Sequence, residues 1–341
     1  MVPADLFFCA DWGMDGRPVW GANVKDQNRV DVMNLETQKN YDPLFRWLTV
    51  LCSAVSLLLV AGILVELFMG SRLTLEKFGL GFLFSSTWDP VAKNFGAASS
   101  IYGTFLSTII SMVIAVPLSL VIALFLVEMA PPRVSSLFGG AIELLAAIPS
   151  IIYGMWGLFV FAPFMADYVQ PFLSRATGGS FLFKGAPTGI GMLTAGIILA
   201  LMILPFITSV TRDVFQLVPA VVKESAYGMG CTTWEVTRKV TIPYGLQGIL
   251  GACFLGLARA IGETMAVTFV IGNRHAISAS LFAAGNTISS TLANEFTEAS
   301  GNIYLSSLVE LGLVLFVLTF IIQAVALLWL RRTKRKMGAG L

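Results

Sequence analysis

Two ionisable residues stand inside a long apolar stretch of the sequence. Arg259 and Glu263 lie in segment 256–267, which reads GLARAIGETMAV. A charge within a bilayer costs about 2.5–3.5 kcal/mol on insertion scales and normally faces a partner or a water-filled path. A guanidinium offers a planar fork of donors to an oxyanion, and the i, i+4 spacing predicts that Glu263 neutralises Arg259 on one helix face. The pair therefore predicts either a structural ion pair or a pathway for anions, with Thr264 beside it.

A second polar segment, residues 224–243, separates two apolar stretches and reads ESAYGMGCTTWEVTRKVTIP. Pro219 suits a helix start just before it, because the missing N–H is not needed in a first turn. Gly230 suits a left-handed helix end. Thr232 with Glu235 is a capping-box pattern for a second short helix. The segment predicts a rigid pair of short helices that offers a docking surface.

The composition is that of a membrane protein. The chain of 341 residues is 56% hydrophobic and 12% charged, with a mean hydropathy of +0.80, unlike a soluble globular domain. Spanning a hydrocarbon core of about 30 Å requires about 20 helical residues. The fold class is therefore all-α, with about six transmembrane helices, expected near residues 47–69, 101–127, 137–165, 189–211, 247–272 and 304–330.

Prolines and small residues in these spans predict where the helices kink, end or pack closely. The third is over-long and contains Pro149 and Pro163, which predict a kink or a re-entrant end. Pro243 disfavours helix at the residue before it, so the second short helix is expected to stop there. A row of small residues in the fifth span predicts close helix packing in the interior or at a subunit contact. The row consists of Gly248, Ala252, Gly256 and Ala260.

The distribution of Lys and Arg predicts the orientation. With a cytoplasmic N-terminus, fifteen of the 22 basic residues fall on the cytoplasmic side and six outside, while Arg259 lies within a span. This bias places 212–246 and both termini in the cytoplasm. Residues 1–46 lack a signal peptide's basic start and apolar run. We therefore expect a cytoplasmic extension (1–46), a transmembrane permease domain (47–330) and a basic cytoplasmic tail (331–341).

Other polar residues carry less information. Glu66 and Glu128 lie close to predicted span ends, where water solvates them, whereas Glu143 and Glu310 favour helix contacts. The four cysteines show no paired spacing, so neither a disulfide nor a metal site is expected.

An enzyme finds no support in the motifs. His275 is the only histidine, which excludes the HExxH zinc pattern, and GxSxG, GxxxxGK[ST] and Gly-rich dinucleotide turns are absent. An ATP-driven machine containing this chain must therefore take its ATPase from another subunit.

Segment 224–243 resembles the EAA loop of ATP-binding-cassette importer permeases, in which EAA, three residues, Gly and nine residues precede I-x-L-P. Glu224-Ser225-Ala226, Gly230 and Val240-Thr241-Ile242-Pro243 match at the right distances. Segments 147–159 and 259–267 resemble those of phosphate-uptake permeases of the C type (PstC). Segments 277–282 and 293–296 are also similar to that type, and the resemblance covers about residues 80–330.

The resemblance implies the fold of a type I importer permease in a bacterial inner membrane. It implies a heterodimer with an A-type permease, two cytoplasmic ATPase subunits that hold ATP and Mg, and an extracytoplasmic phosphate-binding protein. This chain would bind no cofactor itself and no nucleic acid, and it would contact membrane lipid. Phosphate would pass Arg259, Glu263 and Thr264. The residues expected to couple the ATPase are Glu224, Ala226, Gly230, Trp234 and Pro243.

Three alternatives stay open from the sequence. The anion could be another oxyanion, such as sulfate or molybdate, because attraction by Arg does not choose among tetrahedral anions. The chain could be the A-type partner. It could also be a membrane sensor or scaffold that conducts nothing, although a pure scaffold has no need of charges at the midplane.

Overall fold

A computed structural model describes residues 24–178 and 180–338. Within these ranges every regular element is helical, apart from an isolated bridge between Asp89 and Asn94. The elements are α1 (Val24–Gly70), α2 (Arg72–Phe78), α3 (Gly81–Phe84), α4 (Ala98–Leu124), η1 (Phe125–Met129), α5 (Pro132–Ala146), α6 (Ser150–Trp156), η2 (Gly157–Phe161), α7 (Ala162–Phe164), η3 (Met165–Val169), α8 (Gln170–Ala176), η4 (Phe181–Phe183), α9 (Met192–Gln216), α10 (Ala220–Gly228), α11 (Thr233–Val236), η5 (Thr237–Thr241), α12 (Ile242–Ile261), α13 (Met265–Ile271), α14 (Ile288–Glu295) and α15 (Asn302–Gly338).

The predicted all-α class with six spans is confirmed. Six helical stretches of the described chain are long and apolar enough to cross a membrane: Phe45–Gly70, Ala98–Met129, Ser150–Ala176, Met192–Gln216, Thr233–Ile261 and Asn302–Arg332. The third and fifth differ from the predicted limits. The expected third span separates into α5 and a later span from Ser150, with the break at Pro149. The fifth starts earlier, at Thr233, and stops at Ile261.

The chain divides into two compact units, Met1–Val65 and Glu66–Leu341. In the first unit the structure describes most of α1, and residues 45–65 of this helix are exposed along their whole length. Residues 1–23, half of the extension predicted over 1–46, lie outside the described residues, whereas 24–46 are helical. In the second unit α15 carries the basic segment 331–338 as a continuation of the last span.

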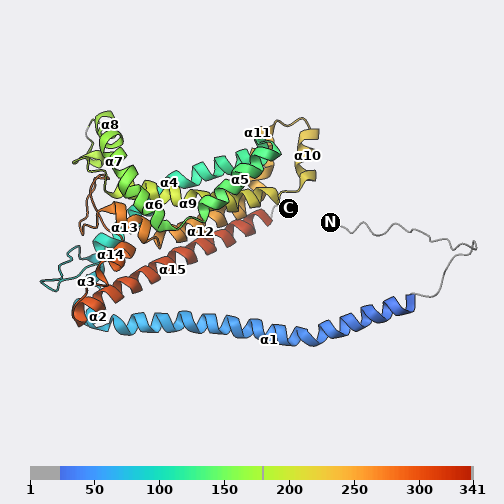
Figure 1. Ribbon diagram of the computed structural model, residues 1–341, viewed down its shortest axis with the longest axis horizontal. Helices are drawn as coiled ribbons and strands as arrows, with labels where there is room; N and C mark the ends of the chain where they lie inside the picture. The colour runs from blue at the N-terminus through green and yellow to red at the C-terminus, as the bar shows by residue number, and fades with distance from the viewer. Residues whose placement is uncertain (1–23, 179, 339–341) are drawn as a thin grey trace, which may run out of the picture. The chain divides into compact units, whose positions relative to one another are not determined.

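The core of the second unit forms around α9. Its side chains Ile198, Leu199 and Ile203 are fully buried and pack with buried residues of α4, α12 and α13. The predicted row of small residues faces this helix, because a Cβ on Gly248 would meet Val214, and one on Gly256 would meet Ile207. The row is therefore ordinary bundle packing. Figure 1 shows α4, α9 and α12 side by side within the second unit.

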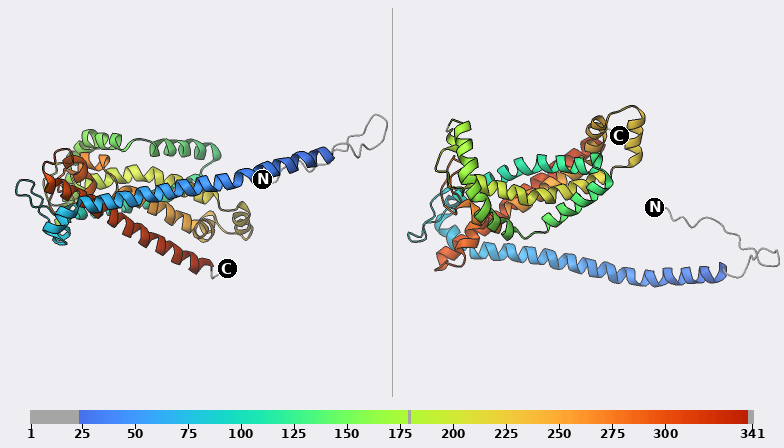
Figure 2. Two further views of the ribbon diagram at one scale, coloured as in Figure 1. Left: turned by 90° about the horizontal axis from the view of Figure 1, so that it is seen from below. Right: turned by 45° about the horizontal axis from the view of Figure 1, so that its top comes forward.

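The two ends of the second unit differ in content. α10 and α11 lie at one end, and α8, α13 and α14 lie at the other (Figures 1 and 2). The first end holds the polar segment 224–243, while the second holds the loops between α13, α14 and α15. α14 is closed at its start by a capping box between Thr287 and Ser290.

Short π-helical segments recur before prolines. η1, η2, η3 and η5 each end two residues before a proline: Pro131, Pro163, Pro171 and Pro243. A proline lacks the N–H of the α-helical bond and its ring clashes with the carbonyl four residues earlier. A wider turn moves that carbonyl away, which lets three of the four helices continue. The prediction that Pro243 stops the helix is therefore wrong, since Thr233–Ile261 is continuous.

Candidate translocation and coupling sites

Arg259 and Glu263 lie at the junction between α12 and α13. α12 ends at Ile261, and residues 262–264 are not helical before α13 begins at Met265. Glu263 Oε1 accepts a hydrogen bond from the N–H of Ala266 at 3.3 Å. The carboxylate thus satisfies one of the free donors of the first turn of α13. Non-helical backbone at membrane depth is tolerated only inside protein or beside a water-filled cavity.

Arg259 and Glu263 do not form the predicted ion pair. Because α12 ends before Glu263, the i, i+4 geometry is lost, and the carboxylate turns to α13. Within the described residues no acidic side chain forms an ion pair with Arg259. Its guanidinium carbon lies 5.7 Å from the ring centroid of Phe206, a cation–π contact. The side chain is otherwise exposed.

Phe206 indicates the depth of Arg259. It lies close to the middle of α9 (Met192–Gln216), which is a membrane span. The guanidinium beside it therefore lies level with the middle of α9, although Arg259 itself stands two residues before the end of α12. What differs from the sequence prediction is its electrostatic state, since Arg259 offers an uncompensated charge at the surface of this chain.

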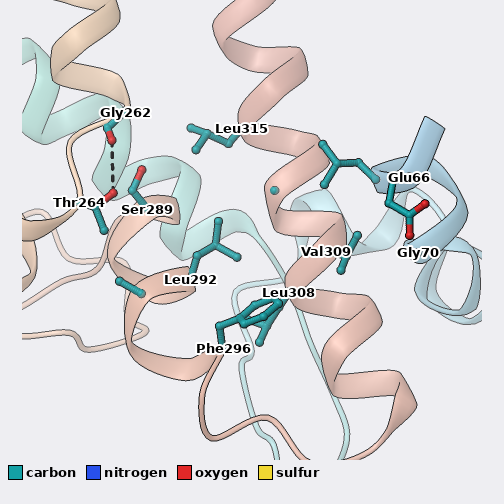
Figure 3. A pocket seen from close by; sticks show the side chains of 13 residues that line it. Glu66, Gly70, Gly262, Thr264, Ser289, Leu292, Phe296, Leu308, Val309 and Leu315 are labelled. Atoms are coloured by element: carbon teal, nitrogen blue, oxygen red, sulfur yellow. Dashed lines mark hydrogen bonds between the residues drawn. The ribbon is translucent and has the colours of Figure 1, made fainter. Parts of the chain in front are cut away.

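The helix break also borders a cavity of about 570 Å³. Figure 3 shows Gly262, Thr264 and Ser289 on one side, with Leu308 and Phe296 below them. Thr264 Oγ1 donates to the carbonyl of Gly262 at 3.3 Å. The structure therefore brings Thr264 to this mainly apolar cavity, whereas Arg259 is not among its lining residues.

Segment 224–243 folds as the predicted helical hairpin. α10 starts after Pro219, and Gly230 has a φ of 86°, in the left-handed region. The capping box is present: the N–H of Thr232 donates to Glu235 Oε2 at 2.9 Å, and the N–H of Glu235 donates to Thr232 Oγ1 at 3.4 Å. The hairpin therefore has a defined shape that follows from local interactions.

The hairpin presents large apolar side chains to its surroundings. Met229 is 79% exposed and Trp234 is 65% exposed, and Glu224 and Gly230 are also exposed. Ala226, in contrast, is 5% exposed. Three of the five predicted coupling residues, Glu224, Gly230 and Trp234, thus lie at the hairpin surface. Pro243 lies in the first turn of α12. Ala226 packs inside and shapes the hairpin instead of presenting a contact.

The sequence did not predict the partners in two ion pairs at the hairpin end. Arg212 Nη1 lies 3.1 Å from Glu143 Oε1, joining α9 to α5, in keeping with the helix contact expected of Glu143. Lys223 Nζ lies 2.6 Å from Glu128 Oε1, and the Glu128 side chain is only 7% exposed. The expectation of a solvated Glu128 is therefore wrong. Its partner is 95 residues away in sequence, so no local signal could have found it.

A polar cluster at the opposite end joins several outer segments. Glu295 accepts from Trp88 Nε1 at 2.5 Å and from the Tyr304 hydroxyl at 2.8 Å, and His275 Nε2 lies 2.7 Å from its Oε1. The amide of Asn286 donates to His275 Nδ1 at 2.9 Å, so Nε2 carries the proton toward Glu295. Burial favours the neutral form of Glu295, but the bonds from His275, Tyr304 and Trp88 outweigh it and hold its pKa below the ordinary value.

Acidification is expected to destabilise this cluster. A carboxyl whose pKa is lowered by folding adds stability above its unfolded pKa, and that stability is lost as the pH falls through the folded value. Glu295→Gln is expected to lower stability at neutral pH by about 1–3 kcal/mol, because buried donors lose a charged acceptor. The variant's melting temperature in detergent should also depend less on pH as the pH falls below about 5. Glu298→Gln, at an exposed position, is the control, and equal pH profiles for wild type and Glu295→Gln would contradict the prediction.

Six apolar helices of spanning length in the described chain, joined by short connections and a projecting hairpin, define a multi-pass membrane protein. Residues 115–335 match the family described as binding-protein-dependent transport system inner membrane component, and the chain belongs to this family. It is 55% identical over 302 residues to the "phosphate transport system permease protein PstC" of Mesorhizobium japonicum, covering 87% of this chain and 92% of that relative. A relative of the same name from Pasteurella multocida is 49% identical over 299 residues, with coverage of 86% and 93%.

A solved structure has a similar fold. The chain aligns with a bacterial alginate ABC transporter in complex with an alginate pentasaccharide-bound periplasmic protein, with a TM-score of 0.56 and 14% identity, over 84% of this chain and 95% of that one. This likeness concerns the fold alone. Together the comparisons confirm the resemblance to C-type phosphate-uptake permeases and a transport subunit, not an enzyme, of the inner membrane.

Proposed function

We propose that this chain is the C-type permease subunit of an ATP-driven importer of inorganic phosphate, forming half of its membrane channel. The observation that carries the proposal is the 55% identity, across 87% of the chain, to a relative named as a phosphate transport system permease. Family membership supports a component that works with a binding protein. The choice of phosphate over sulfate or molybdate rests on the relatives' names.

Arg259 supports an anion as the cargo. A guanidinium near mid-span that pairs with no carboxylate of the described chain attracts negative charge. Its side chain is exposed and the Phe206 ring stabilises the cation where it stands, so the attraction for a passing anion stays weak enough for release. We propose that phosphate passes this guanidinium, with Glu263 and Thr264 shaping the adjacent helix break.

The exposed hairpin supports coupling to a separate ATPase. We propose that Glu224, Gly230 and Trp234 lie at the docking surface, and that Ala226 and Pro243 hold the shape behind it. Closure of two ATPase subunits, which bind ATP and Mg, would move the hairpin as a rigid body and switch the channel between inward- and outward-facing states. An A-type permease completes the channel, a phosphate-binding protein delivers the anion from outside, lipid surrounds the spans, and neither a cofactor of its own nor nucleic acid is involved.

The orientation follows from the hairpin and the charge distribution. The end that carries α10 and α11 would face the cytoplasm, because the segment 212–246 belongs to the basic side of the sequence. Both termini would then be cytoplasmic.

Reconstitution tests the cargo directly. The chain is assembled in proteoliposomes with the products of its neighbouring genes, and ATP hydrolysis is measured with the binding protein loaded with phosphate, sulfate or molybdate. Phosphate is expected to stimulate hydrolysis and to accumulate in the vesicles, whereas the other two anions leave hydrolysis at its basal rate. If only sulfate or only molybdate stimulates hydrolysis, that anion and not phosphate is the cargo. Assembly without stimulation or accumulation of any anion would favour a sensor or scaffold.

A further inference from the structure

One carboxylate oxygen holds both arms of the hairpin. Glu128 Oε1 lies 2.6 Å from Nζ of Lys223, in α10, and accepts the hydroxyl hydrogen of Thr241 at 3.0 Å. Thr241 ends η5, in the arm that continues into α12. Glu128 itself lies in η1, the π-helical end of the span that begins with α4. The two arms of the hairpin therefore meet at the end of another membrane span.

This junction is buried. The Glu128 side chain is 7% exposed, that of Lys223 is 17% exposed, and Thr241 is fully buried. Water therefore competes little for the three groups, and a charged hydrogen bond in such surroundings is short and strong. Losing either charge would leave the other buried without a partner, which is strongly unfavourable. The burial of the three groups therefore favours keeping all of their mutual contacts.

The span that receives the junction belongs to the core. Next to Glu128, Ala123 and Phe215 are fully buried and Ile249 is nearly so, and they pack together from α4, α9 and α12. Val127 and Ile242 pack against this cluster. Interiors packed in this way transmit displacement instead of absorbing it. A movement of the hairpin would therefore pass through Glu128 into three spans at once.

We propose that Glu128, Lys223 and Thr241 form a tie that makes the hairpin and the core spans move as one body during transport. The three are positioning residues, because none of them touches the anion or the ATPase in this account. The tie rests on the proposed function, in which the hairpin receives force from the ATPase. Its specific consequence is that breaking it separates ATP hydrolysis from phosphate movement in a complex that is still assembled.

The test uses a double substitution. Glu128→Gln and Lys223→Met each leave one buried charge unpaired, so each alone is expected to lower the melting temperature of the complex. The double variant removes both charges and is expected to recover assembly and thermal stability. In proteoliposomes with the ATPase, the A-type permease and the binding protein, it should keep basal hydrolysis but move at least about fivefold less phosphate per ATP than wild type.

Three further variants sharpen the result. Lys223→Arg keeps the charge and the donors, and should retain coupling. Glu143→Gln makes the matched change at the α5–α9 ion pair, which holds no part of the hairpin, and should leave the ratio of phosphate to ATP unchanged. Thr241→Val removes one neutral donor, so the complex should stay intact. It should lower the ratio of phosphate moved to ATP hydrolysed. This variant serves as the test if the double variant fails to assemble.

The outcomes separate the tie from the proposed function. If the wild-type complex neither assembles with the ATPase nor moves phosphate, the proposed function fails before the variants are compared. If wild type transports phosphate and the assembled double variant, or Thr241→Val in its place, shows the wild-type ratio of phosphate to ATP, the tie is overturned.

Discussion

Replacing Arg259 with glutamine is expected to reduce phosphate uptake at least about tenfold while the complex still assembles. The guanidinium lies near mid-span, and no carboxylate of the described chain pairs with it. Its removal leaves no partner charge buried and unpaired, so the fold should tolerate the change. A charged hydrogen bond contributes about 1.5–3 kcal/mol, and its loss at the step where the anion passes would slow transport at least about tenfold. Radiolabelled phosphate uptake in cells or proteoliposomes measures the effect.

Two further arginine variants make this result specific. Arg259→Lys keeps a positive charge without the planar fork and should retain part of the uptake. Arg175→Gln removes an exposed arginine of α8 and should have no effect. Copurification with the other subunits verifies assembly in each case. Normal uptake by an assembled Arg259→Gln complex would remove this residue from the mechanism.

Gly230→Val is expected to uncouple transport from ATP hydrolysis. Gly230 has a φ of 86°, and the left-handed conformation costs an ordinary residue about 1–2 kcal/mol, more for a β-branched one. The space around the residue is open, so the strain comes from the backbone alone. The turn should relieve it by rotating α11 relative to α10, which displaces Trp234 from the docking surface. In proteoliposomes, phosphate uptake should fall while ATP hydrolysis continues at its basal rate, no longer stimulated by the binding protein.

Two hairpin variants serve as comparisons. Gly230→Asn should be milder, because asparagine enters the left-handed region more readily. Gly228→Ala adds a Cβ to the helical end of α10, where nothing lies within 4 Å, and should leave transport near the wild-type rate. A Gly230→Val complex that binds the ATPase and transports at the wild-type rate would contradict the docking account.

The hairpin and the bundle differ in how far their details could be predicted. In the hairpin, the capping box of Thr232 with Glu235 and the left-handed Gly230 were predicted correctly, because each depends on bonds among a few adjacent residues. The six spans were predicted for a similar reason, since apolar length is itself the requirement for crossing a bilayer. Pro243 was misjudged because the π-helical turn that precedes it accommodates the proline within a continuous helix.

The sequence by itself determined the class of protein, because apolar length and short motifs depend on local chemistry. Its composition and motifs specify a membrane permease with a helical hairpin between two spans. Tertiary structure alone decided which charges meet. Arg259 and Glu263 have the spacing of a pair, yet the helix ends between them and their partners become Phe206 and the first turn of α13. Glu128 finds Lys223 across 95 residues. Because a buried charge takes its partner from whichever helix packs beside it, the order of residues along the chain leaves that choice open until the spans come together.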